Sequence, residues 1–139
     1  MAGKQTFTMI KPIAVKKNYI GAILKIINEA GFNIKALKYT HLTKQQAMCF
    51  YAVHEGKYFY EELTTFMSSG PIVAAILEKE NAVDDFRKLI GATDPKKAEE
   101  GTIRKMFAES MSHNAIHGSD SDENAIIESD FFFSKMERY

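Results

Sequence analysis

Apolar and polar residues follow two repeating patterns along the chain, and the alternating pattern predicts strands. Thr6 to Lys11 alternates, is rich in β-forming residues, and stops at Pro12. In a second strand Phe32, Ile34 and Ala36 alternate with polar residues, and then the phase slips so that Leu37 and Tyr39 carry the apolar face, which indicates a β-bulge. The predicted strands are Thr6–Lys11, Phe32–Leu42, Ile72–Leu77, which is apolar throughout, and Phe131–Phe133.

Apolar residues at helical spacing predict the helices between these strands. Capping residues such as Thr43, Asn81 and Thr102 mark helix starts, and Gly31 and Gly91 mark helix ends. The second and third helices follow each other directly and form a helical hairpin. The predicted helical stretches run from Asn18 to Gly31, Thr43 to Val53, Gly56 to Gly70, Asn81 to Gly91, Thr102 to Ala108, and for one turn after Ser121.

The order of these elements is typical of one fold class. With the hairpin treated as an insertion, the order is β-α-β-β-α-β, in which four antiparallel strands carry helices on one face. We therefore predict an α+β, ferredoxin-like fold with an inserted helical hairpin. The chain has no repeat and no linker, so residues 1–139 are predicted to form a single domain.

The composition of the chain limits the cellular compartment and the kinds of partner that we expect. Eighteen basic and eighteen acidic residues give no net charge, which argues against a general nucleic-acid or membrane surface. The single Cys49 excludes an internal disulfide, and no apolar run approaches the length of a signal peptide or a membrane span. We expect a soluble, cytoplasmic protein.

The strongest candidate for chemistry is His117, which lies in a polar segment before the last apolar run. Imidazole titrates near pH ~6.5, so at neutral pH a ring nitrogen offers a lone pair that can attack phosphorus without a separate base. Gly118 would allow close approach of a ligand or a positive φ, and Glu128 could hold one ring nitrogen. A histidine in such a segment can also be a solvated surface residue.

Positive charge for a phosphate would have to come from side chains. Neither of the two glycine-rich phosphate-binding motifs is present, whereas Lys11, Arg87 and Arg104 lie on three separated segments, as expected of a folded cationic pocket. No histidine or cysteine spacing predicts a metal site held by the protein. We expect the other three histidines, His41, His54 and His113, to be surface or structural residues.

Several segments together resemble the nucleoside diphosphate kinase family. The most specific is Asn114-x-x-His117-Gly118-Ser119-Asp120-Ser121 with Glu128 downstream, which is similar to the active-site signature of that family. The resemblance covers essentially the whole chain. The other matching segments, in the same order as in the family, are Met9–Pro12, Phe50–His54, Ser69–Pro71, Gly91–Pro95 and Gly101–Arg104.

The resemblance implies a role for each matching residue. His117 would take the γ-phosphate of ATP or another nucleoside triphosphate on Nδ1 and pass it to a nucleoside diphosphate. Glu128 and Ser119 would position the imidazole and the incoming phosphate. The nucleotide-binding residues that the resemblance implies are Arg87, Thr93 and Arg104 for the phosphates, Lys11 and Asn114 for the ribose, Tyr51 beside the transferred group, and Phe59 stacked on the base.

The resemblance also implies a cofactor and an assembly. Mg²⁺ would arrive on the nucleotide phosphates, and the chain would form a homo-oligomer, a tetramer or a hexamer. The sequence departs from the commoner family pattern at Lys57-Tyr58, where a basic residue followed by proline is usual. It does not indicate base preference or any role outside catalysis.

Two other functions are compatible with parts of the sequence. The predicted fold also hosts single-stranded RNA binders, but their aromatic signature is absent. A phosphohistidine carrier or a histidine phosphatase would also use a reactive histidine. Such a protein would pass its phosphate to another protein or to water instead of to a nucleoside diphosphate.

Overall fold

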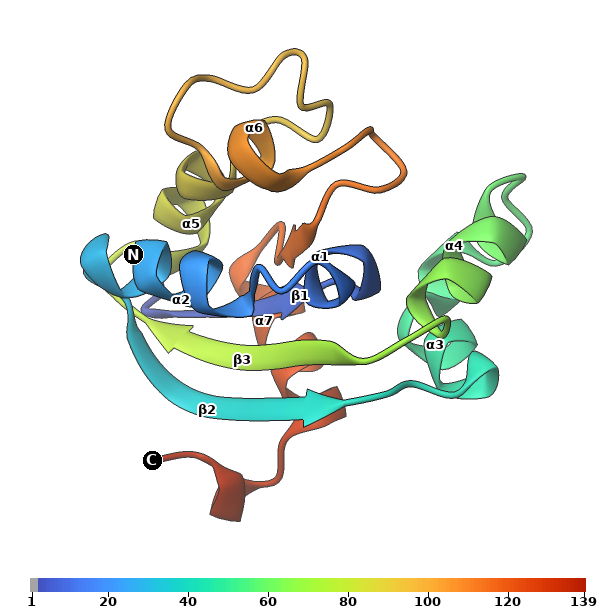
Figure 1. Ribbon diagram of the computed structural model, residues 1–139. Coiled ribbons are helices and arrows are strands. Elements are labelled where there is room, and N and C mark those ends of the chain that lie inside the picture. Colours follow the sequence, from blue (N-terminus) through green and yellow to red (C-terminus); the bar gives the residue numbers. More distant parts are fainter. Residues whose placement is uncertain (1–2) are drawn as a thin grey trace.

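A computed structural model describes residues 3–139 and contains a four-stranded antiparallel sheet (Figure 1). The strand order β2-β3-β1-β4 is that of a ferredoxin-like fold, so the predicted fold class is confirmed. β2 does contain a bulge, but it lies between Ile34 and Ala36, before the predicted slip, and it leaves Leu37 and Tyr39 exposed. The strands are β1 (Gln5–Ile10), β2 (Asn33–Thr40), β3 (Ile72–Glu78) and β4 (Ile116–Gly118).

Most helices lie where the spacing of apolar residues predicts them. One additional helix, α1, was not predicted, because Pro12 occupies the first turn of a new helix as well as ending β1. The first hairpin helix, α3, ends before Val53 and continues as a single 3₁₀ turn, η1. The helices are α1 (Pro12–Lys16), α2 (Ile20–Glu29), α3 (Lys44–Phe50), η1 (Ala52–His54), α4 (Tyr60–Met67), α5 (Ala82–Ile90), α6 (Ile103–Phe107), α7 (Asp122–Phe132) and η2 (Lys135–Glu137).

Capping residues set the helix boundaries largely as predicted. The hydroxyls of Thr43, Thr102 and Ser121 each accept a hydrogen bond from the backbone N–H three residues on. Asn81 is the N-cap residue of α5 as predicted, but its side chain makes no capping hydrogen bond. This residue adopts a left-handed conformation, and its side-chain amide donates to Asp85 instead of capping the helix.

The last strand is not where the sequence predicts it. Phe131 and Phe132 end α7, which runs for three turns instead of one, and Phe133 is its C-cap residue. The fourth strand is β4, which contains His117 and pairs with β1. The histidine segment is therefore part of the sheet, and its backbone is held by the β1 ladder.

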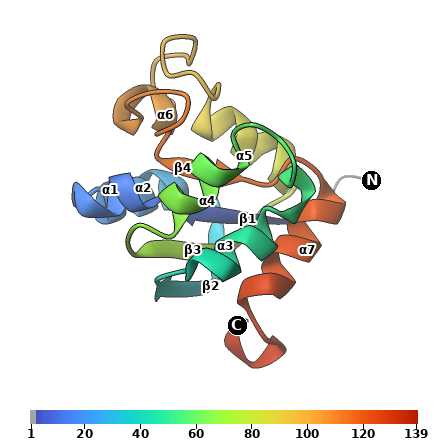
Figure 2. The ribbon, with the colours of Figure 1, turned by 90° about the vertical axis from the view of Figure 1, so that its right-hand side faces the viewer.

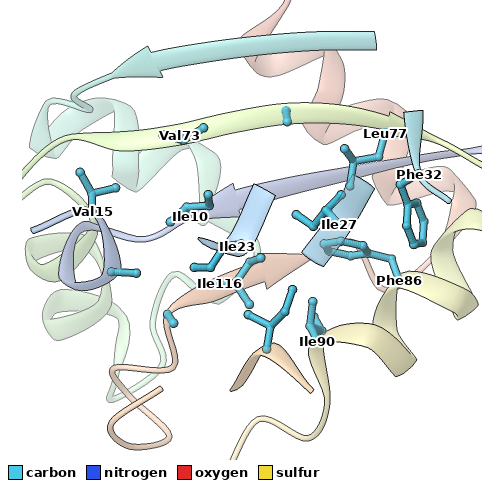
Figure 3. Close-up of a cluster of buried hydrophobic side chains, with 14 of the residues drawn as sticks. Ile10, Val15, Ile23, Ile27, Phe32, Val73, Leu77, Phe86, Ile90 and Ile116 are labelled. Carbon is cyan, nitrogen blue, oxygen red and sulfur yellow. The ribbon is translucent and has the colours of Figure 1, made fainter. Parts of the chain in front are cut away.

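Hydrophobic side chains cover both faces of the sheet. On one face, α2 and α5 pack against β1 and β3 through residues such as Ile23, Ile27 and Phe86 (Figure 3). These are the helices predicted for one face. The other face is covered too, because Met67 of α4 and Phe132 of α7 pack there against the sheet. The sheet is the middle layer of three.

The α3–α4 hairpin stands at one end of the sheet, beyond the end of β2 and the start of β3 (Figure 1). Figure 2 looks onto this hairpin, with the loop between α3 and α4 turned toward the viewer. No helix within residues 3–139 is long and apolar enough to cross a membrane.

Candidate active site

The register of the sheet determines which way His117 faces. His117 pairs with Met9 of β1, and paired residues on neighbouring strands point to the same face. Met9 belongs to the core cluster that also contains Phe132 of α7. The imidazole therefore lies on the face that α7 covers, where the ring of Phe7 has its centroid 6.2 Å from that of the imidazole.

A single carboxylate oxygen of α7 holds the imidazole. Oε1 of Glu128 lies 2.9 Å from Nε2 of His117 and accepts a hydrogen bond of 2.7 Å from the hydroxyl of Ser119. With Nε2–H donating to a carboxylate, Nδ1 keeps its lone pair. Nδ1 makes no hydrogen bond to any other residue in the range 3–139. The side chain is about one fifth exposed.

The residues on either side of His117 are tightly constrained. Ala115 has a φ of +74°, and the N–H of Ile116 donates to the carbonyl of Asn114, so residues 114–116 form a strained γ-turn. Gly118 does not have the positive φ that was one expectation. Glycine is needed there for another reason, because a Cβ would lie 3.0 Å from side-chain carbons of Phe86 and Ile90.

The structure brings Lys11 and Asn114 together. The Nζ of Lys11, which is buried, donates to the side-chain oxygen of Asn114 at 2.7 Å. The backbone N–H of Lys11 also donates to the carbonyl of Ala115. Burial and, secondarily, the charge of Arg104 lower the pKa of Lys11 to about 7. This ammonium therefore titrates in the neutral range.

Arg104 joins two segments of the site. Its guanidinium donates to the carbonyls of Gly91, at 3.0 Å, and Ile116, at 2.9 Å. Burial and, secondarily, the charge of Arg87 lower its pKa to about 10, so Arg104 remains charged at neutral pH. A Cβ on Gly91 would overlap Thr102, so the chain passes closely over the start of α6 here.

Two cavities adjoin at Thr93. The smaller, of about 230 Å³, is lined by Arg87, Thr93, Arg104 and Gly118, the residue after His117. The larger, of about 610 Å³, lies between the α3–α4 hairpin and residues 111–114. Its lining includes Lys11, Phe59, Thr93 and Asn114, together with Tyr58, Glu62, Met111 and His113. One cavity is thus cationic, and the other carries aromatic and apolar surface.

Four predicted residues, Tyr51, His117, Ser119 and Glu128, line neither cavity. Among the predicted nucleotide-binding residues, Tyr51 is the only one of these. It is buried, and burial together with the charge of Glu128 raises the pKa of its phenol, which stays protonated at neutral pH. Its ring stacks on that of His54, with centroids 6.4 Å apart. Tyr51 lies beneath the cavity wall.

Sequence reasoning missed His54. Its ring lies 5.2 Å from Phe59, its Nδ1 accepts a hydrogen bond of 3.4 Å from Lys57, and it lines the larger cavity. Burial and the charge of Lys57 lower its pKa. Its position three residues after Tyr51, at the turn of the hairpin that carries Phe59, was the available signal.

The charged groups of the two cavities are suited to a ligand that carries a bound metal ion. Within residues 3–139, no three histidine, cysteine, aspartate or glutamate side chains lie together as a metal site. The smaller cavity is lined by two arginines, which bind phosphate oxygens, whereas Mg²⁺ prefers carboxylate and phosphate oxygens. This donor set fits a phosphate ester whose oxygens carry the ion.

The fold and the site define a class of protein, a ferredoxin-like domain in which the strand that carries a carboxylate-bound histidine also borders a cavity lined by two arginines. A family model described as nucleoside diphosphate kinase matches residues 4–138. The chain therefore belongs to the nucleoside diphosphate kinase family.

Individual relatives agree with this assignment. A nucleoside diphosphate kinase of Flavobacterium psychrophilum is 59% identical over 139 residues, which is all of both chains. The structure of the Aquifex aeolicus nucleoside diphosphate kinase has a TM-score of 0.95 and 43% identity, covering 98% of this chain and 99% of that one. A Halobacterium salinarum nucleoside diphosphate kinase, solved in complex with CDP, has a TM-score of 0.93 and 35% identity over 98% of this chain and 91% of that one.

Proposed function

We propose that His117 is the residue through which this chain carries out the reaction of its family, transfer of the γ-phosphate of a nucleoside triphosphate to a nucleoside diphosphate. The chain is an enzyme, a phosphotransferase that binds nucleotides. The observation that supports His117 is its hydrogen bond through Nε2 to Glu128, because this bond leaves the lone pair of Nδ1 available.

The reaction consists of two similar half-reactions. In the first, Nδ1 forms a bond to the γ-phosphorus, the bond from phosphorus to the β–γ bridging oxygen breaks, and the nucleoside diphosphate leaves. The phosphorylated ring keeps its Nε2 proton, and the carboxylate of Glu128 stabilises the resulting positive charge. In the second, a terminal oxygen of another diphosphate attacks the phosphorus and Nδ1 leaves. The kinetics are therefore ping-pong.

The two cavities divide the nucleotide between them. Arg87, Thr93 and Arg104 would hold the phosphates in the smaller cavity, and phosphoryl transfer depends mainly on such alignment and charge neutralisation. Lys11 and Asn114 would reach the ribose hydroxyls in the larger one. Phe59 would stack on the base, and because every base has a π-face we expect activity with many bases.

Two further components belong to this proposal. Mg²⁺, when bound, adds positive charge on the phosphates, and its ligands would be nucleotide oxygens, with Arg87 and Arg104 holding the rest of the polyphosphate. Ser119, with Glu128, would position the imidazole and the incoming phosphate, and Tyr51 would lie near the transferred group alongside Lys11. Ser119 is suited to this role because its hydroxyl is fixed by Glu128.

The test is a label transfer. We would incubate the protein with γ-labelled ATP and Mg²⁺, chase with GDP or CDP, and compare wild type with His117→Ala. Acid-labile label on the wild type that moves to the added diphosphate, and no label on the variant, is the expected result. Label that moves only to water or to another protein would indicate a phosphohistidine phosphatase or carrier, and absence of label would favour a binding module.

We also propose that the chain is a homo-oligomer, a tetramer or a hexamer. The outer edge of β2 has no neighbouring strand within residues 3–139, and it exposes Leu37 and Tyr39. α7 exposes Ile126, Ile127 and Phe131. Apolar surface of this extent is typical of subunit contacts, and sedimentation equilibrium would measure the number of subunits.

Two remaining expectations are part of the same proposal. Residues 1–139 would act as one domain, and the enzyme would work in the reducing cytoplasm. The free thiol of Cys49, which is exposed, is compatible with such a compartment. Fractionation of cells that express a tagged chain would test the location.

A further inference from the structure

The turn that opens α4 presents two aromatic rings side by side. The N–H of Tyr60 donates to the carbonyl of Lys57 at 3.1 Å, so Tyr58 and Phe59 occupy the central positions of the turn. Phe59 has φ −89° and ψ −3°, the values of the third residue of a type I turn. Both residues therefore sit on a hydrogen-bonded turn, and each projects its ring from it.

The two rings differ in how much the protein covers them. Phe59 is partly buried against His54, whereas Tyr58 is 98% exposed. Phe59 is the only aromatic residue within residues 3–139 whose ring packs against that of Tyr58, with centroids 5.4 Å apart and planes at 86°. Packing within the chain thus gives no reason for a tyrosine here.

The exposed ring nevertheless belongs to the cavity. Tyr58 and Phe59 both line the space of about 610 Å³ whose other side is formed by Met111 and His113. Aromatic side chains contribute large contact areas at little cost in conformational entropy. A ring that the protein leaves uncovered at the mouth of this cavity is therefore placed to be covered by a ligand.

We propose that Tyr58 is a second aromatic contact for the nucleobase and makes the site favour purines over pyrimidines. The proposal rests on the proposed function, because it requires the base to stack on Phe59. The ring plane of Tyr58 is nearly perpendicular to that of Phe59. A base stacked parallel to Phe59 would therefore contact the Tyr58 ring edge to face and would not stack on it. A two-ring purine extends farther beyond the edge of the Phe59 ring than a one-ring pyrimidine does, so it would gain more contact with Tyr58.

The expected effect is on binding and not on the chemical step. Edge-to-face aromatic pairs contribute about 0.5–1.5 kcal/mol, which corresponds to a change of about twofold to tenfold in affinity. Tyr58→Ala should weaken ADP binding by about this factor and change CDP binding by less than about twofold. Tyr58→Phe should bind ADP as wild type does, because the ring and not the hydroxyl makes the contact.

The test is calorimetric titration of the full chain with ADP and with CDP, each with Mg²⁺. The variants are Tyr58→Ala, Tyr58→Phe and Phe59→Ala, with Tyr139→Ala as the matched control because Tyr139 is also an exposed tyrosine, 86% accessible, outside both cavities. Selective loss of ADP affinity in Tyr58→Ala, with weakened binding of both ligands in Phe59→Ala, supports the proposal.

Other results overturn it, and they separate the two proposals. If Tyr58→Ala binds both ligands as wild type does while Phe59→Ala is weakened, Tyr58 is no base contact and the proposed site stands. Equal losses for ADP and CDP in Tyr58→Ala would refute the purine preference. If neither Tyr58→Ala nor Phe59→Ala changes binding, the base does not occupy this cavity, and the proposed function loses its base-binding site.

Discussion

Nε2 of His117 and Oε1 of Glu128 lie 2.9 Å apart, across the junction between the sheet and α7. The same oxygen accepts a hydrogen bond from the hydroxyl of Ser119. One carboxylate atom therefore fixes both the tautomer and the orientation of the imidazole, and the serine fixes the carboxylate. These three side chains should behave as a unit in kinetic measurements.

The first prediction concerns this unit. Glu128→Ala should lower kcat about 10²-fold, because the ring loses its orientation, and Ser119→Ala should lower it less. Because both act through the same imidazole, the double variant should be little worse than Glu128→Ala alone. Steady-state kinetics of the two single variants and the double variant measure the coupling. Strictly additive losses would show that Ser119 acts independently of Glu128.

The second prediction concerns protons taken up with the nucleotide. The pKa of Lys11 in the free protein is about 7, so at pH 8 its amine is mostly neutral. Phosphate negative charge favours the ammonium form and raises this pKa, so binding of ADP at pH 8 should take up close to one proton. At pH 5.5 Lys11 is already charged, and the uptake should vanish.

The measurement is calorimetry of ADP binding in buffers with different ionisation enthalpies. Lys11→Met should bind more weakly, and its binding should lack the uptake at pH 8 that wild type shows. An uptake in Lys11→Met equal to that of wild type would assign the proton to another group.

The third prediction separates the two arginines of the smaller cavity. The side chain of Arg87 is exposed and makes no hydrogen bond to another side chain or carbonyl within residues 3–139, whereas the guanidinium of Arg104 donates to the carbonyls of Gly91 and Ile116. Arg87→Ala should weaken nucleotide binding and leave stability unchanged. Arg104→Ala should weaken binding and rate and also cost about 1–3 kcal/mol of unfolding free energy, because two carbonyls lose their donor. Urea denaturation and ADP titration of both variants distinguish them.

The fourth prediction concerns the glycine beside the histidine. A Cβ at Gly118 would lie 3.0 Å from Phe86 and Ile90, so Gly118→Ala should destabilise the protein by about 1–3 kcal/mol through overpacking. Gly21→Ala in α2 is the control, since nothing lies within 4 Å of its added carbon and alanine favours helix. Thermal denaturation of the two variants should move the midpoint in opposite directions. If Gly118→Ala has the same thermal midpoint as wild type, α5 moves to accommodate the added methyl group without loss of stability.

Much of this site could be predicted because its chemistry depends on residue type. The three cations Lys11, Arg87 and Arg104 were predicted to share one pocket; Arg87 and Arg104 line the smaller cavity together, whereas Lys11 lines the larger cavity that adjoins it. Glu128 also holds His117 as predicted. The strand order follows from the sequence of elements and from the handedness of their connections.

The helix near the end of the chain could not be predicted, because α7 exposes large apolar residues and buries small or polar ones. Its inward positions are Ala125, Ser129 and Phe132, two of them small or polar. Its exposed positions include Ile126 and Ile127, so apolar periodicity does not show which side is buried. The run of three phenylalanines then has the composition of a strand, and tertiary packing overrides that local preference. β4 is too short for alternation to be visible.

The central position of β1 has a consequence for synthesis of the protein. β1 precedes both of its neighbours, β3 and β4, along the chain, and Lys11 meets Asn114 across 103 positions of sequence. Contacts between such distant segments slow folding, and a nascent chain that lacks β4 and α7 keeps one edge of β1 unpaired and lacks both His117 and Glu128. A ribosome-bound chain would thus form the pair of His117 and Glu128 only after α7 has been synthesised, and until β4 pairs with β1 the open β1 edge is a surface for chaperones to shield.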